Sequence, residues 1–369
     1  MGGGTPSSSN ESFWQGTIPW ISSSDIVEND IKNISISRYI TEEAIAHSAT
    51  KLCPAPSILI VSRVGVGKIA LSKEAICTSQ DFCNLINIKV EPIFLTYCLS
   101  QIMKRKSMEV QGTSIKGITT SEIQKISINI PSLQEQKKIG KILSLLDERI
   151  ATQNKIIDKL QSLIKGLNDF LYTQYGGEVL TSFAELGTSY SGLSGKSAQD
   201  FGSGKPFITY LNVYSNNVIK ENDFQYVAIK DDEKQNVVKY GDVLFTLSSE
   251  TPEEVGVGSV YLGKEKVYLN SFCFGIHITN TEVAFPPYLS YYVSLTAFRK
   301  FIYPYAQGST RFNLCKADFE KASIKLPTLA DQKRIYSVLG HIDCKIETER
   351  QMLNLYNSQK QYLLRQMFI

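Results

Sequence analysis

The sequence of 369 residues lacks the marks of several classes of protein. It contains no run of 18 apolar residues, so no membrane-spanning helix is expected. The first residues, Met1 to Pro6, lack the basic and apolar regions of a signal peptide. The seven cysteines are scattered without a CxxC pair, which indicates reduced thiols and a cytoplasmic protein. Apolar residues make up 43% of the chain, enough to exclude collagen-like, disordered and disulfide-scaffold classes.

The sequence also lacks an excess of charge and has few histidines. Its net charge is +3, so composition alone gives no basic footprint for nucleic acid. The three histidines, His47, His277 and His341, do not have the spacing of metal ligands. We therefore expect no metal and no cofactor in this chain.

Motifs that resemble catalytic loops are incomplete. The segments 65–68 and 202–205 each end in Gly-Lys, but neither has the earlier glycine nor the following Ser or Thr of a phosphate-binding loop. The first is interpreted as a tight turn between strands. Phe285 precedes Pro-Pro-Tyr where an amino-methyltransferase needs a polar side chain, so this segment is interpreted as the start of a helix. No Ser/His/Asp arrangement is supported by spacing, although such triads are spatial. The chain is expected not to be an enzyme.

An internal duplication is the most informative feature. Residues 111–172 align without a gap onto 307–368, with 16 identities in 62 positions. Gaps are needed only upstream, where the glycines of 64–67 match those of 255–258. Two long copies are too few for a solenoid. The sequence therefore predicts two related units, 1–175 and 176–369.

Each copy is predicted to be a mixed α+β domain followed by one long helix. β-rich runs at 57–61 and 242–247 are bounded by Gly, Pro and Ser, and prolines open short helices at 92–103 and 287–301. The predicted parts are a first domain (1–131), a first spacer helix (132–175), a second domain (176–326) and a second spacer helix (327–369).

The two long helices carry a heptad pattern. Ser132 and Glu135 have the spacing of a capping box at the start of the first helix. From there apolar residues alternate at spacings of four and three, which is typical of a coiled-coil seam. A polar residue interrupts each seam, at equivalent places in the two copies. It either sets the helix register or is simply solvated. The seam residues are Ile139, Leu143, Leu146, Ile150, Gln153, Ile157, Leu160, Ile164, Leu167 and Leu171, then Ile335, Leu339, Ile342, Ile346, Glu349, Leu353, Tyr356, Leu363 and Met367.

The obvious partner of each seam is the other copy's helix. The ends of a compact domain usually lie close together, so the second helix starts where the first ends and the pair runs antiparallel. This predicts two tandem domains joined by an antiparallel coiled coil with pseudo-two-fold symmetry. The alternative is that each helix packs on its own domain alone. A helix of about 39 residues spans roughly 58 Å, comparable to half-sites one or two DNA turns apart.

Two repeated motifs and the opening of the first domain give the chain a family resemblance. Glu135–Ile139 and Asp331–Ile335 both read acidic-Gln-basic-basic-Ile, each after Pro, a hydroxyl residue and Leu. Asp147 and Asp343 follow along each helix, and Gly3 to Ser7 with Ile18 to Ile21 opens the first domain. In this order the motifs resemble the specificity subunit of type I restriction–modification systems, over essentially the whole chain.

That resemblance implies a function without catalysis. Two target-recognition domains each read half of a bipartite, asymmetric site in double-stranded DNA. The long helices set the spacer and dock two methyltransferase subunits, which carry S-adenosylmethionine and the chemistry, and a restriction subunit can join. One departure is that residues 178–186, interpreted as an entry strand, have no counterpart before Gly4. The first domain is therefore expected to have a shortened or miscalled start.

Candidate DNA-binding residues are those that suit phosphate or base edges. They lie in the loops before each helix, in basic clusters and beside the glycine turn. For each of them, the plain alternative to a DNA contact is an ordinary polar turn or a solvated charge. In the first copy they are Ser22, Ser23, Arg63, Lys68, Lys104, Arg105, Lys106, Thr113, Ser114 and Lys116. In the second they are Lys196, Lys205, Thr209, Arg299, Lys300, Ser309, Thr310, Arg311 and Asn313.

Two other functions stay open at this point: a stand-alone nucleic-acid methyltransferase and a scaffold whose domains bind proteins. The predicted domains carry net charges of +1 and −2. Because phosphate contacts set most non-specific affinity, the chain alone is expected to hold DNA weakly. Under the specificity-subunit hypothesis, the partner subunits provide much of the affinity for DNA.

Overall fold

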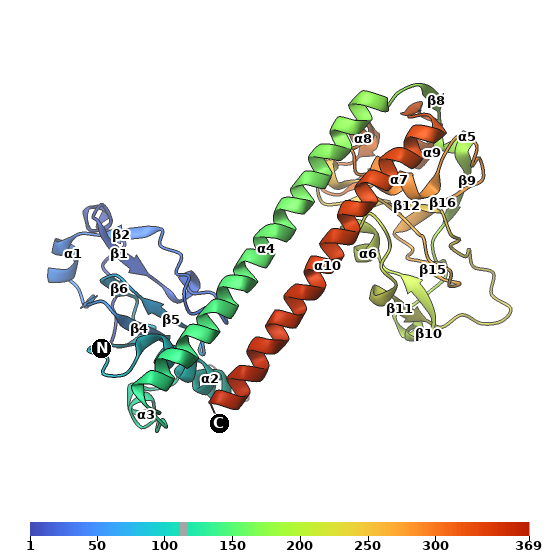
Figure 1. The fold of residues 1–369 in the computed structure, drawn as a ribbon. Helices are drawn as coiled ribbons and strands as arrows, with labels where there is room; N and C mark the ends of the chain where they lie inside the picture. The colour runs from blue at the N-terminus through green and yellow to red at the C-terminus, as the bar shows by residue number, and fades with distance from the viewer. Residues whose placement is uncertain (111–116, 369) are drawn as a thin grey trace. The chain divides into compact units, whose positions relative to one another are not determined.

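The computed structural model describes residues 1–110 and 117–368 and divides the chain into two compact units. Unit 1 holds residues 1–154 and 351–369, and unit 2 holds 155–350. Each unit therefore combines one globular part with a portion of both long helices (Figure 1). The prediction of a mixed α+β chain with two long helices is confirmed. The division into two domains and two separate spacer helices stays a prediction.

Unit 1 contains a four-stranded sheet of order β2-β1-β6-β3 and a three-stranded sheet of order β5-β4-β7. The predicted strand at 57–61 is observed as β4. Its side chains are all buried: Ile58 and Ile60 face one apolar cluster, and Leu59 and Val61 face another. The strands are β1 (Ile18–Ile21), β2 (Arg38–Ile40), β3 (Leu52–Cys53), β4 (Ser57–Val61), β5 (Ile69–Ser72), β6 (Ile76–Thr78) and β7 (Phe82–Leu85), and the short helices are α1 (Glu42–Ala46), α2 (Pro92–Val110) and α3 (Thr120–Gln124).

Unit 2 repeats this plan with more strands. Its central sheet has the order β14-β12-β16-β9, with smaller sheets β11-β10-β15, β13-β18-β17 and β19-β8. The strands are β8 (Val179–Thr181), β9 (Gly187–Ser191), β10 (Phe201–Ile208), β11 (Gln225–Val227), β12 (Val243–Thr246), β13 (Ser248–Ser249), β14 (Gly258–Val260), β15 (Tyr268–Leu269), β16 (Cys273–Ile278), β17 (Ala306–Gln307), β18 (Phe312–Leu314) and β19 (Ile324–Leu326), and the short helices are α5 (Phe183–Leu186), α6 (Tyr210–Ser215), α7 (Pro286–Tyr292), α8 (Thr296–Ile302) and α9 (Lys316–Lys321).

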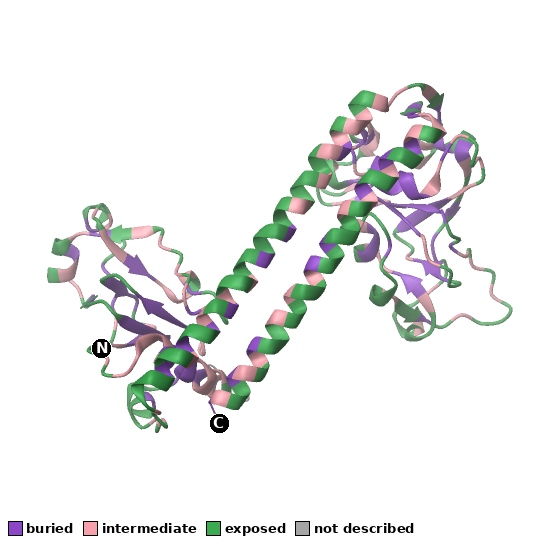
Figure 2. Cartoon of the chain, in the orientation of Figure 1, coloured by how far each residue is buried: buried purple, intermediate pink, exposed green. Residues whose placement is uncertain are grey.

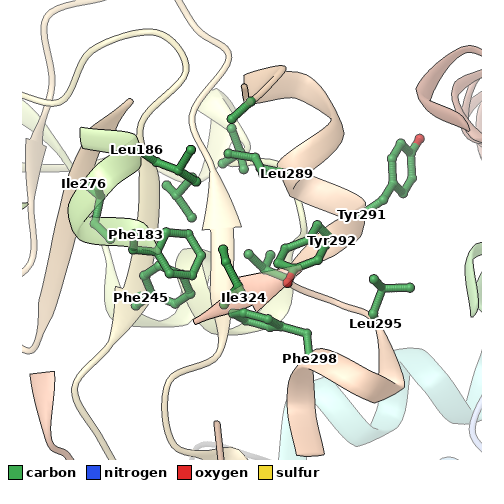
Figure 3. Close-up of a cluster of buried hydrophobic side chains, with 14 of the residues drawn as sticks. Phe183, Leu186, Phe245, Ile276, Leu289, Tyr291, Tyr292, Leu295, Phe298 and Ile324 are labelled. Carbon is green, nitrogen blue, oxygen red and sulfur yellow. The ribbon is translucent and has the colours of Figure 1, made fainter. Parts of the chain in front are cut away.

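An aromatic cluster forms the main core of unit 2 (Figure 3). Phe183 of α5 lies edge-on to Phe245 of β12 at 5.3 Å between ring centroids and close to Phe298 of α8 at 6.0 Å. Each fully buried Phe contributes about 1.5–3 kcal/mol of transfer free energy. The cluster therefore fixes α7 and α8 against the central sheet.

Three predicted elements differ from those observed. The single helix predicted at 287–301 is two helices, α7 and α8. The chain restarts at Thr296 because its N–H and hydroxyl both donate to the Asp169 carboxylate of the long helix α4, at 2.9 and 2.7 Å. The helix predicted at 92–103 continues to Val110. The predicted entry strand at 178–186 is the short strand β8 followed by α5.

The long helices are α4 (Leu133–Tyr175) and α10 (Leu329–Met367). The predicted capping box is confirmed, because the Ser132 hydroxyl accepts the Glu135 N–H at 3.4 Å and the Glu135 carboxylate accepts the Ser132 N–H at 3.2 Å. At α10 the Thr328 hydroxyl accepts the Asp331 N–H at 3.2 Å and donates to the Asp331 carboxylate at 2.6 Å.

Every predicted seam residue is buried or half-buried, on helices whose other faces are mostly exposed (Figure 2). The polar seam residues Gln153 and Glu349 are 5% and 6% exposed, so they are not simply solvated. The helix portions run antiparallel within each unit. In unit 1, Ile139 and Leu143 pack with Leu364 and Phe368, whereas Arg149, later in α4, contacts Tyr356, earlier in α10.

The same direction holds in unit 2. The Arg334 guanidinium lies 5.6 Å from the Tyr175 ring centroid, near the end of α4. Ile346, further along α10, lines a pocket with Ile164, which is earlier in α4. The alternative in which each helix packs only on its own domain is therefore not observed in either unit.

Equivalent joints fasten each domain to the start of its helix. Gln136 is buried, and its side chain accepts the Glu91 N–H at 3.0 Å and donates to the Pro131 carbonyl at 2.8 Å. Gln332 does the same with the Phe285 N–H at 2.7 Å and the Pro327 carbonyl at 2.9 Å. The repeated glutamine of the family motif is thus a structural clamp.

A tyrosine and an aspartate complete each joint. The Tyr97 hydroxyl donates to Asp147 at 2.5 Å in unit 1, and Tyr291 donates to Asp343 in unit 2. Burial, and then the neighbouring carboxylate, raises the pKa of both tyrosines, which keeps the hydroxyls protonated as donors. The duplication seen in the sequence is therefore repeated in the contacts of these two joints.

Candidate nucleic-acid interface

The glycine turn of unit 1 joins β4 to β5, as predicted from segment 65–68. Gly65 and Gly67 have φ of +89° and +104°, a region that favours glycine. The predicted phosphate contact Arg63 is exposed beside this turn. Lys68 folds back, and its ammonium group donates to the Ser23 carbonyl at 3.2 Å.

Ser22 and Ser23, predicted as DNA contacts, also serve local structure. The Ser22 N–H donates to the Asp25 carboxylate at 2.7 Å, and its hydroxyl accepts from Arg38 at 2.7 Å. Arg38 pairs with Asp25 as well. This network fixes the segment that follows β1, and it leaves the exposed Arg63 as the freest of the candidates near the turn.

The basic cluster 104–106 lies on α2 and is partly engaged. Lys104 donates to the Asn29 side chain at 3.4 Å, and Arg105 donates to the Phe368 carbonyl at 2.9 Å. Lys106 is half-buried on the same helix. Lys104 and Gly67 line one pocket of unit 1, so the structure brings the basic helix and the glycine turn together. Thr113, Ser114 and Lys116 lie outside the described residues.

Three candidates of unit 2 are used inside the fold, which favours the plain alternative for them. Lys196 forms a 2.5 Å ion pair with Glu233, and its side chain is 8% exposed. Thr209 caps α6 by accepting the Asn212 N–H at 3.1 Å. The Arg299 guanidinium donates to the carbonyls of Gly256, Glu253 and Val255 at 2.7–2.8 Å, and burial lowers its pKa.

The remaining candidates of unit 2 are exposed. Lys205 lies on β10 and Lys300 at the end of α8. Ser309, Thr310 and Arg311 occupy the turn between β17 and β18, where Gly308 has a φ of +139°. Asn313 lies on β18 opposite Ser248 of β13. The predicted loop before the second helix is therefore a surface hairpin.

This hairpin forms one wall of a groove, which we call the Arg311 groove. Its lining residues come from α6, from β13 and the segment after it, from the turn before β16, and from the hairpin: Tyr210, Leu211, Tyr214, Ser248, Ser249, Glu250, Glu254, Phe272, Thr310 and Arg311. Sequence reasoning found only Thr310 and Arg311, because the other residues come from distant segments without a shared motif.

The helices of unit 1 enclose a second groove, lined by Leu145, Glu148, Arg149, Thr152, Gln153 and Tyr356. Leu145 is 48% exposed, and the Arg149 guanidinium lies 5.9 Å from the Tyr356 ring centroid. The heptad pattern located the seam itself but gave no sign of this groove beside it.

A buried cluster in unit 2 joins an aspartate, a histidine and a tyrosine far apart in the sequence. The Asp242 carboxylate lies 2.8 Å from His277 Nδ1 and accepts the Tyr190 hydroxyl at 2.6 Å. Desolvation raises the pKa of Asp242 in spite of these hydrogen bonds. The Tyr190 and His277 rings stack at 4.2 Å. Because Tyr190 and His277 both contact this one carboxylate, the cluster links β9 and β16 to the start of β12.

Among the described residues, no helix is both long and apolar enough to cross a membrane.

Comparisons with known proteins identify the family. The model of the type I restriction modification DNA specificity domain matches twice, at residues 1–162 and 186–355. The chain is 33% identical over 169 residues (43% of this chain) to the type I restriction enzyme MjaIX specificity subunit of Methanocaldococcus jannaschii, and 36% identical over 156 residues (40%) to the EcoR124I/EcoR124II specificity subunit of Escherichia coli. Each match spans 38% of the relative's own length.

A solved structure has a similar fold. The S subunit of a type I restriction–modification system from M. genitalium superimposes with a TM-score of 0.55 at 15% identity, covering 100% of this chain and 93% of that one. Because the two matches of the family model together cover most of the sequence, the chain belongs to the type I restriction–modification DNA specificity family.

Proposed function

We propose that this chain is the DNA specificity subunit of a type I restriction–modification complex. It reads a bipartite, asymmetric site in double-stranded DNA, one half with each globular part, and acts in the cytoplasm beside two methyltransferase subunits and a restriction subunit. The observation that carries the proposal is the family match to each repeat separately. Catalysis is assigned to the partners, and the family match favours neither a stand-alone methyltransferase nor a protein scaffold.

The candidate DNA contacts are divided by their surroundings. Arg63, Lys205 and Lys300 are exposed, which suits contact with phosphate or bases, and Arg311 is exposed but donates one hydrogen bond to Ser248. Lys68, Lys104 and Arg105 are engaged through single hydrogen bonds that a phosphate could replace. Lys196 and Arg299 are the weakest candidates, because their charges are satisfied inside unit 2.

The test is methylation by the reconstituted complex. The chain, assembled with type I methyltransferase subunits, is expected to methylate one split sequence in a DNA library and to leave random DNA unmodified. Methylation spread over random sequence would contradict the proposal. Saturable S-adenosylmethionine binding by the isolated chain would instead favour a stand-alone methyltransferase.

We further propose that the methyltransferase subunits dock on a second apolar stripe of the long helices. In α4, Ile142, Ile156, Leu163 and Phe170 are 37–56% exposed and lie at multiples of seven residues. In α10, Met352 and Leu355 are 37% and 69% exposed. A seam residue follows directly after each of the α4 residues, so α4 has two adjacent apolar stripes, the pattern of a helix packed in a bundle.

This docking proposal is tested by Leu163→Glu, with Lys155→Glu as the control on an exposed polar position of the same helix. A buried charge at an interface anchor is expected to weaken assembly with the methyltransferase by about 10- to 30-fold. The measurement is the subunit dissociation constant by sedimentation or interferometry. Equal affinity for both variants and the wild type would contradict docking on this stripe.

A further inference from the structure

We propose that Arg311 is a specificity-determining residue that reads a guanine in the half-site bound by the second domain. The inference rests on the proposed function and adds to it the identity of a base contact. Arginine is the side chain that pairs in a bidentate manner with guanine O6 and N7 in the major groove.

The charges around Arg311 favour a base edge over a phosphate. Glu250 and Glu254 are both exposed and line the same groove. Hydrogen bonds from Tyr214 and Ser249 lower the pKa of Glu254, so its carboxylate remains ionised. Two carboxylates repel a charged phosphate backbone more strongly than they repel uncharged base edges, and a carboxylate accepts a hydrogen bond from cytosine N4. An arginine and glutamates that line one groove therefore match the two edges of a G·C pair.

The Arg311 side chain is held by a serine and a phenylalanine of the groove. Its Nη2 donates to the Ser248 hydroxyl at 3.3 Å, and its guanidinium lies 5.8 Å from the Phe272 ring centroid. A guanidinium has five N–H donors, and Ser248 takes one of them. The contacts orient the group and leave donors available for a bidentate contact.

The groove floor that holds Ser248 is itself fixed. Ser248 pairs with Asn313 across β13 and β18, and its carbonyl accepts the Tyr210 hydroxyl at 2.8 Å. Tyr210 begins α6, which Thr209 caps. We infer that Thr209 also acts on the groove through α6, as a positioning residue.

Apolar side chains are also exposed on this groove, and their exposure does not stabilise the fold. Leu211 is 69% exposed and Phe272 is 55% exposed. Leaving such side chains in water forgoes the stabilisation that their burial would give. Base edges carry apolar groups, above all the thymine methyl, that side chains of this kind contact. DNA in the groove would cover both residues while Arg311 contacts the guanine.

The guanine contact is expected for one half-site only. The ungapped repeat alignment places Ile115 at the position of Arg311, and isoleucine has no donor for a base edge. The change is in keeping with two domains that read different sequences.

The experiment maps methylated sites for the whole complex carrying wild-type chain, Arg311→Ala, Arg311→Lys or Lys321→Ala. Lys321 is the matched control, because it is an exposed cation of the same unit, at the end of α9 and outside the groove. Arg311→Ala is expected to lose the preference for guanine at one position of one half-site. The rate on guanine-containing sites falls by about 10- to 100-fold relative to other bases there. Arg311→Lys keeps part of the preference.

The outcomes separate this inference from the proposed function. A phosphate contact would give uniform weakening across sequences, a salt dependence reduced by about one ion and an unchanged motif, which would overturn the guanine assignment. An unchanged motif and unchanged affinity would overturn it too. Failure of the wild-type complex to select any site would contradict the proposed function itself. Circular dichroism of Arg311→Ala, whose side chain is exposed, checks that the fold is kept.

Discussion

At the scale of single residues, the repeated motif has a structural meaning that its sequence did not reveal. Gln136 and Gln332 are recognisable as parts of a family motif, but only the structure places their amides between a helix start and the preceding domain. Arg299 shows the opposite. It has the type and position of a phosphate contact, yet it binds three carbonyls of unit 2. Residue type alone predicts a surface contact well only where the side chain is not already occupied by backbone carbonyls of the fold.

We predict that Gln332→Ala destabilises the protein by about 2–3 kcal/mol, whereas Gln134→Ala has little effect. Gln332 is fully buried, and its loss leaves the half-buried Phe285 N–H and the buried Pro327 carbonyl without this partner. Gln134 is exposed on α4. The midpoint of urea unfolding measures the difference, and equal midpoints for the two variants would contradict the clamp.

At the scale of elements, the sequence pattern predicted the helices and strands that neighbouring residues determine. It missed features that depend on contacts between residues far apart in the sequence. Heptad spacing gave the seam of α4 and α10, and the apolar run at 57–61 gave β4, because each pattern is written in consecutive residues. The break between α7 and α8 was missed because Asp169, more than a hundred residues away, binds Thr296. The Arg311 groove was missed for the same reason.

Lys360 is a further polar residue at a heptad position of the α10 seam. It is 8% exposed in unit 1, 2.5 Å from Asp147 and 5.9 Å from the Tyr97 ring centroid. The equivalent position in the first copy is Ile164. The ion pair therefore belongs to one unit only and marks where the two copies have diverged.

We predict that Lys360→Ala destabilises the packing of the α10 end in unit 1 by about 3–5 kcal/mol, because it leaves Asp147 as a partly buried charge without its cation. Gln359→Ala, at the adjacent exposed position, is the control. Hydrogen exchange of residues 355–367 measures the change. Protection that is the same in both variants would show that the ion pair contributes nothing to this packing.

At the scale of the whole molecule, near-neutral charge has a consistent explanation. Domains that carry +1 and −2 cannot obtain much affinity from phosphates. The Arg311 groove, with one cation and two carboxylates, is suited to choosing bases and not to general attraction. We expect the chain alone to bind DNA weakly and with little selectivity, and the complex with methyltransferase subunits to bind its site tightly.

We propose above all that each repeat reads its own half of one site. A domain swap tests this proposal: residues 1–131 are replaced with the matching domain of another family member, and the methylated sequences of the reconstituted complex are mapped. One half of the split sequence is expected to change while the other half and the spacer length between them stay the same. A swapped complex that kept the whole original site, or changed both halves at once, would contradict it.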